Sequence, residues 1–440
     1  MPEVSLSDLP FIATVKRFVV AYSGGLDSHV LLHRVAGLVN TEQQDKKIVA
    51  VHINHGLSAQ AGQWTTHCAS QCEALGVLFK NVDVDAKNMS GESPEAAARA
   101  ARYQAFRGFM QPGDCLLTAH HQDDQAETLL IQLLRGAGPR GLAAMPSYAD
   151  FAKGWHARPL LNFSRDALSD YAQQKGLSWI DDESNSDTRF DRNFLRHEIM
   201  PVLKSRFPGM AATLSRSATL CAEAAELLAE VAADDLAQVQ VDAGCFSVSG
   251  LRALGEVRAR NLLHQCCRDR GLSTPSAAQL QCVWEEVIGA AVDSEPVVSW
   301  AGGEARRYRD TLFIGTPLPE HDATQSLPWD RTQALSIRGL GELQADAVTG
   351  QGIASQALAG KRLEIRFRQG GEKLRPVGRE GHHALKKLFQ EAGVPPWRRD
   401  RIPLLYADGQ LLAVAGFWLE HAAAAQADEP GLVLHWTPSA

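Results

Sequence analysis

The chain has 440 residues, and its contents of 45% apolar and 22% charged residues are typical of a folded globular protein. These values exclude a collagen, a coiled-coil rod and a mostly disordered chain, and the length indicates two or three domains. The net charge of −7 is unevenly distributed, because Lys361–Arg401 contains twelve Lys and Arg against five Asp and Glu. This basic segment in an otherwise acidic chain favours a separate module that binds a polyanion.

The sequence also indicates where the protein works. No apolar run approaches the ~20 residues needed to cross a bilayer, and Met1–Val15 lacks the pattern of a signal peptide. The eight cysteines include no CxxC pair, which argues against a disulfide framework or a zinc site. We therefore expect a cytoplasmic protein, not bound to a membrane, with reduced thiols.

The N-terminal part of the chain alternates β-branched runs with helical patterns. The predicted strands are Arg17–Tyr22, Ile48–Ile53, Val77–Val84, Asp114–Thr118 and Ala157–Leu161. The predicted helices are Ser28–Val39, Gly62–Leu75, Ser93–Phe109, Asp123–Leu134 and Ser164–Lys175. This order predicts an α/β fold with a doubly wound parallel sheet, whose ligand binds at the carboxyl ends of the strands.

The pattern changes after Pro208. Helices are predicted at Ala211–Val239, Gly250–Arg270 and Pro275–Gly289, followed by a hairpin over Val297–Gly315. Beyond a proline-rich stretch, strands at Leu335–Leu343, Leu363–Arg368 and Leu411–Trp418 surround a helix at Leu385–Glu391. We therefore predict a catalytic domain at 1–209, a mainly helical domain at 210–316, a linker at 317–334 and a small basic α+β domain at 335–440.

The strongest local signal is Ser23-Gly24-Gly25-Leu26-Asp27-Ser28, between the first predicted strand and helix. Two glycines let backbone N–H groups approach phosphate oxygens, and the helix N-terminus favours an anion. The stretch lacks the lysine of a Walker loop. Asp27 would repel a phosphate unless a divalent cation lay between them, which predicts bound Mg²⁺. The alternative is an ordinary turn with Asp27 and Ser28 as a helix cap.

A second cluster, His120–Thr128, also lies between a strand and a helix. Asp123, Asp124 and Glu127 fall within one helical turn. Helix capping explains one or two of these carboxylates, but not three carboxylates together with His120 and His121. Both clusters end strands of the same predicted sheet, so we expect them to face one site.

These motifs resemble the PP-loop ATP pyrophosphatases and, more closely, the tRNA(Ile)-lysidine synthase family. SGGLDS matches the PP-loop pattern SGGxDS. The other matching segments are VHINHGLS (51–58), EAAARAARY (95–103), HHQDDQAET (120–128), RPLL (158–161), DRNFLRHEIMP (191–201), RQGGEKLRP (368–376), LKKLFQEAGVPPWRRDRIPLL (385–405) and AVAGFW (413–418). The order and completeness of these segments distinguish the family from the wider superfamily.

The resemblance implies a two-step reaction. ATP adenylates C2 of the wobble cytidine in an isoleucine tRNA with a CAU anticodon, releasing pyrophosphate, and the amine of free L-lysine then displaces AMP. By this resemblance ATP binds to Ser23, Gly24, Gly25, Leu26, Asp27, Ser28, His52, Asn54 and His121, and lysine to Arg102, Asp123, Asp124 and Glu127. The predicted catalytic residues are Asp27, Asp124, Glu127, Arg99 and Arg196, with Asp27 as the metal ligand. Which carboxylate receives the ammonium and which arginine pairs with the carboxylate of lysine stay open.

The basic tail is the predicted tRNA-binding module, because lysines and arginines alternate there with aromatic residues. The predicted tRNA contacts are Arg192, Arg368, Lys373, Arg375, Lys386, Lys387, Trp397, Arg398, Arg399 and Arg401. A PP-loop tRNA thiolase is the nearest alternative, although such enzymes usually rely on CxxC pairs or paired active-site cysteines, and this chain has no CxxC. A non-enzymatic ATP-binding sensor is the other alternative, and a homodimer stays open.

Overall fold

The computed structural model describes residues 4–54, 61–84, 94–180, 187–291 and 294–439, without the side chains of 61, 94–96 and 98. The chain divides into two compact units, residues 1–231 and 232–440. The boundary falls inside the long helix α9 (Met210–Val239). The predicted division into four segments stays a prediction. None of the described helices is long and apolar enough to cross a membrane.

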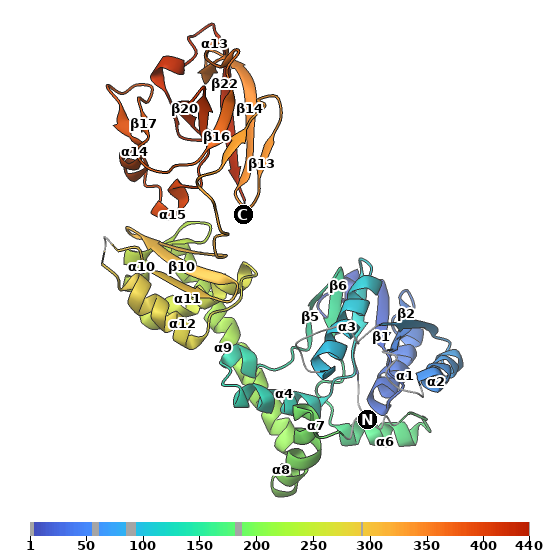
Figure 1. The fold of residues 1–440 in the computed structure, drawn as a ribbon. Coiled ribbons are helices and arrows are strands. Elements are labelled where there is room, and N and C mark those ends of the chain that lie inside the picture. Colours follow the sequence, from blue (N-terminus) through green and yellow to red (C-terminus); the bar gives the residue numbers. More distant parts are fainter. Residues whose placement is uncertain (1–3, 55–60, 85–93, 181–186, 292–293, 440) are drawn as a thin grey trace. The chain divides into compact units, whose positions relative to one another are not determined.

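The first unit is built around a six-stranded sheet in the order β3-β2-β1-β4-β6-β5 (Figure 1). Its strands are β1 (Arg17–Ala21), β2 (Lys47–Asn54), β3 (Leu78–Asp83), β4 (Asp114–Leu117), β5 (Tyr148–Phe151) and β6 (Gly154–Ala157). All neighbouring strands are parallel except β5, which forms an antiparallel hairpin with β6. The predicted doubly wound sheet is therefore confirmed.

Helices cover both faces of this sheet, so its central strands are apolar throughout. Phe18 and Val20 of β1 belong to one buried cluster with side chains of α1 and α6, whereas Val19 belongs to another cluster with Phe106 of α3. The helical elements of the unit are η1 (Ile12–Thr14), α1 (Leu26–Thr41), α2 (Ala61–Ala74), α3 (Pro94–Phe109), α4 (Gln122–Leu134), α5 (Pro139–Leu142), α6 (Arg165–Gln174), α7 (Asp191–Phe194), the π-helix η3 (Leu195–Ile199) and α8 (Met200–Arg206).

The second unit begins with a five-stranded antiparallel sheet packed on helices. The strands, in the order β7-β8-β11-β10-β9, are β7 (Gln240–Asp242), β8 (Cys245–Ser247), β9 (Val297–Trp300), β10 (Gly303–Tyr308) and β11 (Thr311–Gly315). The helices are α10 (Val248–Leu254), α11 (Glu256–Asp269), α12 (Ala277–Cys282) and the π-helix η4 (Val283–Ile288). The predicted hairpin is therefore part of a larger sheet. The single helix predicted over 250–270 is wrong, because Gly255 has a φ of +82° and separates α10 from α11.

The rest of the second unit contains two antiparallel sheets and a short strand pair. One sheet has the order β12-β16-β19-β20-β21 and another β13-β14-β22-β15, while β17 pairs with β18. The strands are β12 (Ser326–Pro328), β13 (Leu335–Ile337), β14 (Gly341–Thr349), β15 (Ile353–Ala354), β16 (Leu363–Arg366), β17 (Lys373–Leu374), β18 (His383–Ala384), β19 (Leu404–Ala407), β20 (Gln410–Val414), β21 (Trp418–Leu419) and β22 (Pro430–Pro438). The helices are α13 (Ser355–Leu358), α14 (Leu385–Glu391), α15 (Pro396–Arg399) and η5 (His421–Ala423).

Three predicted boundaries differ from the structure. The strand expected at Ala157–Leu161 is β6, and it ends at Ala157 because the turn that follows contains Pro159, which has no N–H to donate to a neighbouring strand. The expected linker at 317–334 contains β12, which pairs with β16. The expected strand at Leu335–Leu343 is two strands, β13 and β14, joined by a turn at Gly339 with a φ of +73°.

Candidate active site

The loop between β1 and α1 has the geometry of a phosphate-binding loop. Gly24 has a φ of +85°, and a Cβ atom there would lie 2.8 Å from Cys68 Sγ, so only glycine fits. The Ser28 hydroxyl donates to Gly25 O over 2.9 Å and lies 3.0 Å from Ser23 Oγ. Gly25 is the N-cap of α1 and supplies no side-chain cap, which leaves the first N–H groups of this helix to an anion.

Asp27 lies in the first turn of α1, beside this loop. Its Oδ2 is 3.6 Å from His121 Nε2, while its Oδ1 is buried and has no hydrogen-bond partner among the described residues. Such an oxygen suits a divalent cation shared with phosphate oxygens. The described residues contain no cluster of three or more metal-ligating side chains. Mg²⁺ held by Asp27 would therefore take its other ligands from ATP and water.

His121 and Asp124 form a capping box at the start of α4. The His121 N–H donates to Asp124 Oδ2 over 3.0 Å, and the Asp124 N–H donates to His121 Nδ1 over 3.4 Å. Burial lowers the pKa of His121, but the neighbouring carboxylates of Asp27, Asp124 and Asp123 outweigh it and raise the pKa. Burial raises the pKa of Asp124, but His121 and the nearby arginines outweigh it and lower that pKa to about 2.

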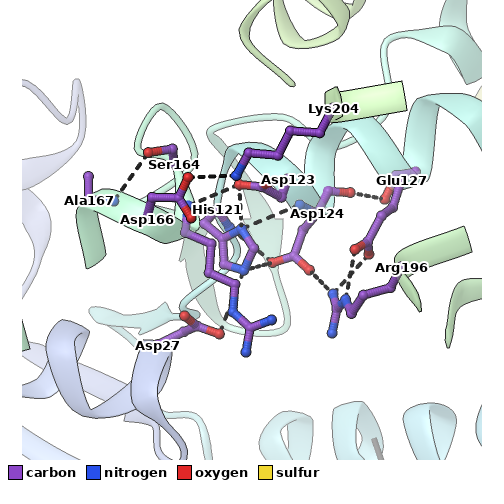
Figure 2. A network of polar contacts seen from close by, with 12 residues as sticks. Asp27, His121, Asp123, Asp124, Glu127, Ser164, Asp166, Ala167, Arg196 and Lys204 are labelled. Carbon is purple, nitrogen blue, oxygen red and sulfur yellow. Dashed lines mark hydrogen bonds and ion pairs between the residues drawn. The ribbon is translucent and has the colours of Figure 1, made fainter. Parts of the chain in front are cut away.

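Glu127 is the most enclosed carboxylate of the cluster, at 2% exposure. Arg192 Nε of α7 donates to its Oε2 over 2.8 Å, and Arg196 Nε of η3 donates to its Oε1 over 2.7 Å. Arg196 also donates to Asp124 Oδ1 over 2.8 Å (Figure 2). Burial lowers the pKa of Arg196, but its contacts with Glu127 and Asp124 outweigh this and raise it. Arg192 and Arg196 therefore belong to the carboxylate cluster and not to a solvated end of the domain.

Asp123 has a contact that sequence reasoning missed. Its Oδ2 accepts a hydrogen bond of 2.9 Å from the Arg165 N–H at the start of α6, next to the Ser164 N-cap. The same oxygen lies 3.7 Å from His121 Nδ1. Asp166 on α6 pairs with Lys204 of α8 over 2.6 Å (Figure 2). Asp123 therefore ties α4 to α6, and its predicted contact with lysine stays a prediction.

His52 and Asn54 lie at the carboxyl end of β2. This strand pairs with β1, which precedes the phosphate-binding loop. His52 Nδ1 is 3.0 Å from Tyr22 O, and burial lowers the pKa of His52. Asn54 Nδ2 donates to Asp83 Oδ1 over 2.9 Å. Their place at the strand ends agrees with a nucleotide site, and the rest of the VHINHGLS motif, residues 55–58, lies outside the described residues.

Arg99 and Arg102 lie on α3, where both guanidinium groups are close to the ring of Tyr103, at 5.2 Å and 5.9 Å from its centre. Arg99 is near enough to His120 and His156 to help lower the pKa of each, although burial is the larger cause. Arg99 therefore lies within electrostatic range of both histidines.

The predicted tRNA contacts of the second unit divide into two groups, whereas Arg192 belongs to the carboxylate cluster of the first unit. Lys373, Lys386 and Lys387 are exposed, and the half-buried Arg368 and Arg375 each have an Nε without a hydrogen-bond partner among the described residues. The three lysines are therefore accessible to a polyanion, whereas the unpaired Nε atoms of the two arginines are buried.

The other group, on and beside α15, contacts the sheet at the start of the second unit. The Trp397 ring packs edge-on against Phe313, with 5.5 Å between ring centres, and the guanidinium of Arg398 lies 5.5 Å from the ring centre of Phe313. Arg399 is 6% exposed and donates to Tyr308 Oη over 3.1 Å. Arg401 donates to Pro319 O. These residues hold parts of the second unit together, so their tRNA contacts stay a prediction.

The chain matches three family models. They are described as PP-loop domain, at residues 5–203, TilS substrate binding domain, at residues 246–313, and TilS substrate C-terminal domain, at residues 363–436. The tRNA(Ile)-lysidine synthase of Methylococcus capsulatus is 44% identical over 428 residues, which cover 95% of this chain and 96% of the relative. The chain belongs to the tRNA(Ile)-lysidine synthase family.

A second relative in the lysidine synthase family supports the same membership. The tRNA(Ile)-lysidine synthase of Coxiella burnetii is 41% identical over 431 residues, covering 98% of this chain and 95% of the relative. The predicted family and PP-loop fold are therefore confirmed. In this chain, burial raises the pKa of Cys68, Cys72 and Cys115 to about 12, so these thiols are poorly suited to the sulfur transfer of a thiolase.

Proposed function

We propose that this chain forms lysidine at the wobble cytidine of an isoleucine tRNA with a CAU anticodon. The chain is an ATP-dependent tRNA-modifying enzyme, as its family membership over nearly the whole length shows. The C2 carbonyl oxygen of the cytidine attacks the α-phosphate of ATP and pyrophosphate leaves. The amine of free L-lysine then attacks C2 and displaces AMP, which leaves with that oxygen. A cytoplasmic location and a homodimer stay predictions.

The loop of Ser23–Ser28 supports the adenylation half of the reaction. Its backbone N–H groups and the first turn of α1 would hold the leaving pyrophosphate and stabilise the charge that develops on it. Asp27 offers an unpartnered carboxylate oxygen beside the loop, which fits Mg²⁺. Bound Mg²⁺ would neutralise phosphate charge, while His121 keeps the Asp27 carboxylate oriented over 3.6 Å.

The carboxylate cluster supports the lysine half of the reaction. Asp124, with a pKa lowered to about 2, is too weak a base to take a proton from an ammonium, so it would orient the amine. Glu127 is held from two sides by Arg192 and Arg196, which fixes both of its oxygens. Both carboxylates are thus fixed by arginines, and we assign to both the orientation of the ammonium.

The exposed basic residues of the second unit support tRNA binding. Lys373, Lys386 and Lys387 are exposed and offer phosphate contacts. These residues of the second unit would determine the affinity for tRNA, while the first unit would carry out the reaction.

One observation carries the proposal: the phosphate loop and the arginine-bound carboxylates meet through Asp27, His121 and Asp124. The test is to incubate the protein with unmodified CAU-anticodon isoleucine tRNA, ATP, Mg²⁺ and radiolabelled L-lysine. We expect label in the RNA together with AMP and pyrophosphate. Pyrophosphate release without label would leave only base activation and reopen the thiolase alternative.

A further inference from the structure

A chain of four polar side chains crosses the carboxyl ends of β4 and β6. Arg158 lies 3.3 Å from His156 Nδ1, His156 Nε2 lies 2.8 Å from Thr118 Oγ1, and Thr118 Oγ1 lies 2.9 Å from His120 Nδ1. A guanidinium can only donate, so His156 Nδ1 accepts and its Nε2–H donates to Thr118. The Thr118 hydroxyl then donates to His120 Nδ1. One arginine thus fixes the tautomers of two histidines.

The charge of Arg158 has no counter-ion in this network. Its remaining contacts include Pro146 O, which accepts over 2.7 Å, and the Tyr103 hydroxyl, while its Nε is buried without a hydrogen-bond partner. No carboxylate of the described residues forms an ion pair with Arg158, and Arg99 adds a second positive charge nearby. A half-buried guanidinium without a counter-ion is costly, unless a ligand supplies the negative charge.

The two histidines of this network carry no charge that would change the balance at Arg158. His156 is 4% exposed, and burial together with the charges of Arg158 and Arg99 lowers its pKa to about 3. Burial likewise lowers the pKa of His120 well below its ordinary value. Both imidazoles are therefore neutral near pH 7, and the site keeps a net positive charge.

We propose that Arg158, with Arg99 and Tyr103 beside it, forms an oxyanion-binding site for the α-carboxylate of L-lysine. The inference rests on the proposed function. The charges of Arg158, Arg99, Asp124 and Arg192 all act on His120, so the cationic site and the carboxylate cluster both lie within electrostatic range of this one side chain. Lysine carries an ε-ammonium at one end and, at the other, an α-carboxylate beside an α-ammonium. Its ε-ammonium matches the carboxylate cluster, and its α-carboxylate matches Arg158.

The first test uses the unchanged enzyme and L-lysinamide, which keeps both amines but lacks the carboxylate. We expect the KM of L-lysinamide to exceed that of L-lysine about tenfold, the ratio for one lost charged hydrogen bond of about 1.5 kcal/mol. Equal KM values would overturn the carboxylate assignment. If neither L-lysine nor L-lysinamide is incorporated into the RNA, the proposed function fails. This result is distinct from failure of the inference.

The second test uses Arg158→Met, with Arg107→Met as the matched control on α3, where the guanidinium of Arg107 lies 4.9 Å from the ring centre of Phe151. Arg158→Met should raise the KM for L-lysine about tenfold with kcat little changed, leave the KM for L-lysinamide unchanged, and be partly rescued by Arg158→Lys. The control should change none of these values.

Two further measurements keep this test decisive. If Arg158→Met unfolds, Arg99→Gln, at an exposed position, should produce the same selective loss for L-lysine. A raised KM for tRNA, with unchanged KM values for L-lysine and L-lysinamide, would show that the site binds an RNA phosphate and not the carboxylate of lysine. Unchanged KM values for L-lysine, L-lysinamide and tRNA in a folded Arg158→Met protein would overturn the site.

Discussion

Replacing Glu127 by glutamine removes one negative charge from the carboxylate cluster and keeps the size of the side chain. In the native protein Arg192 and Arg196 donate three hydrogen bonds to the two oxygens of Glu127, at 2.7–2.9 Å. Glutamine retains one acceptor oxygen and places an NH₂ group against guanidinium donors. The substitution therefore leaves two arginines with Asp124 as their remaining carboxylate partner in this cluster.

The structure gives the size of the effect on stability. Removing one partner of a buried ion pair costs about 3–5 kcal/mol. The side chains of Arg192 and Arg196 are 20% and 25% exposed, so water screens part of their charge. We expect a loss of about 2–3 kcal/mol, discounted from that range. For a unit of this size, the loss lowers the thermal midpoint by about 4–12 °C.

The assay is calorimetry of the full chain together with labelled-lysine incorporation. Because Glu127 is proposed to orient the ammonium, incorporation should fall about 100-fold or more, while pyrophosphate release falls less. Glu198→Gln, at an exposed position on η3, is the matched control and should change neither value. An unchanged midpoint and unchanged kinetics in Glu127→Gln would refute both the buried ion-pair argument and the assigned role.

Three further predictions concern other parts of the chain. Asp27→Asn should abolish pyrophosphate release with the thermal midpoint nearly unchanged, because the carboxylate beside the phosphate loop would no longer hold Mg²⁺. Lys386→Met should lower the salt dependence of tRNA binding by about one unit of slope, whereas Arg399→Met should leave the slope unchanged, since Arg399 donates to Tyr308 and Val394 within the second unit. Burial lowers the pKa of His29 to about 4, so the stability that its neutral form provides is present above about pH 6.5 and is lost as the pH falls toward 4; His29→Gln should reduce the difference between the thermal midpoints at pH 7 and pH 5.

Each of these predictions has a contrary result. Pyrophosphate release by Asp27→Asn at the wild-type rate would show that Asp27 is not the metal ligand. A weaker salt dependence of tRNA binding in Arg399→Met would support the phosphate contact that the sequence predicted for Arg399. An identical pH dependence in His29→Gln would show that His33, His52 and His156, whose pKa values burial also lowers, account for the acid sensitivity.

The sequence predicted the first unit well because its signals are local. Strand β1, the glycines of the loop and the carboxylates of α4 are close in sequence to the structures they form, so periodicity and composition identify them. The strand β22 was missed, because it forms only by pairing with β14, about 90 residues earlier in the chain. Such long-range pairing leaves no local pattern.

The types of the site residues were predictable from the sequence, but the side chains that they contact were less predictable. Asp124 and Glu127 stood out as carboxylates at a strand end, but nothing local shows that Arg192 and Arg196, more than 60 positions away, bind them. Arg158 was assigned to a strand and received no role. Its half-buried position next to His156 depends on where β6 ends, which single-sequence reasoning places only within a few residues.

The packing of α15 on the sheet of β10 and β11 affects how shortened forms of this protein would behave. Tyr308 and Phe313 lie on the face of that sheet that Trp397 covers, opposite the face that carries the buried Leu312 and Ala305. Ending the chain at Thr349 would uncover these aromatic rings, and exposed apolar patches promote self-association. Weak RNA binding by such a fragment would then mix a lost binding surface with aggregation, whereas single substitutions at exposed lysines keep the two effects apart.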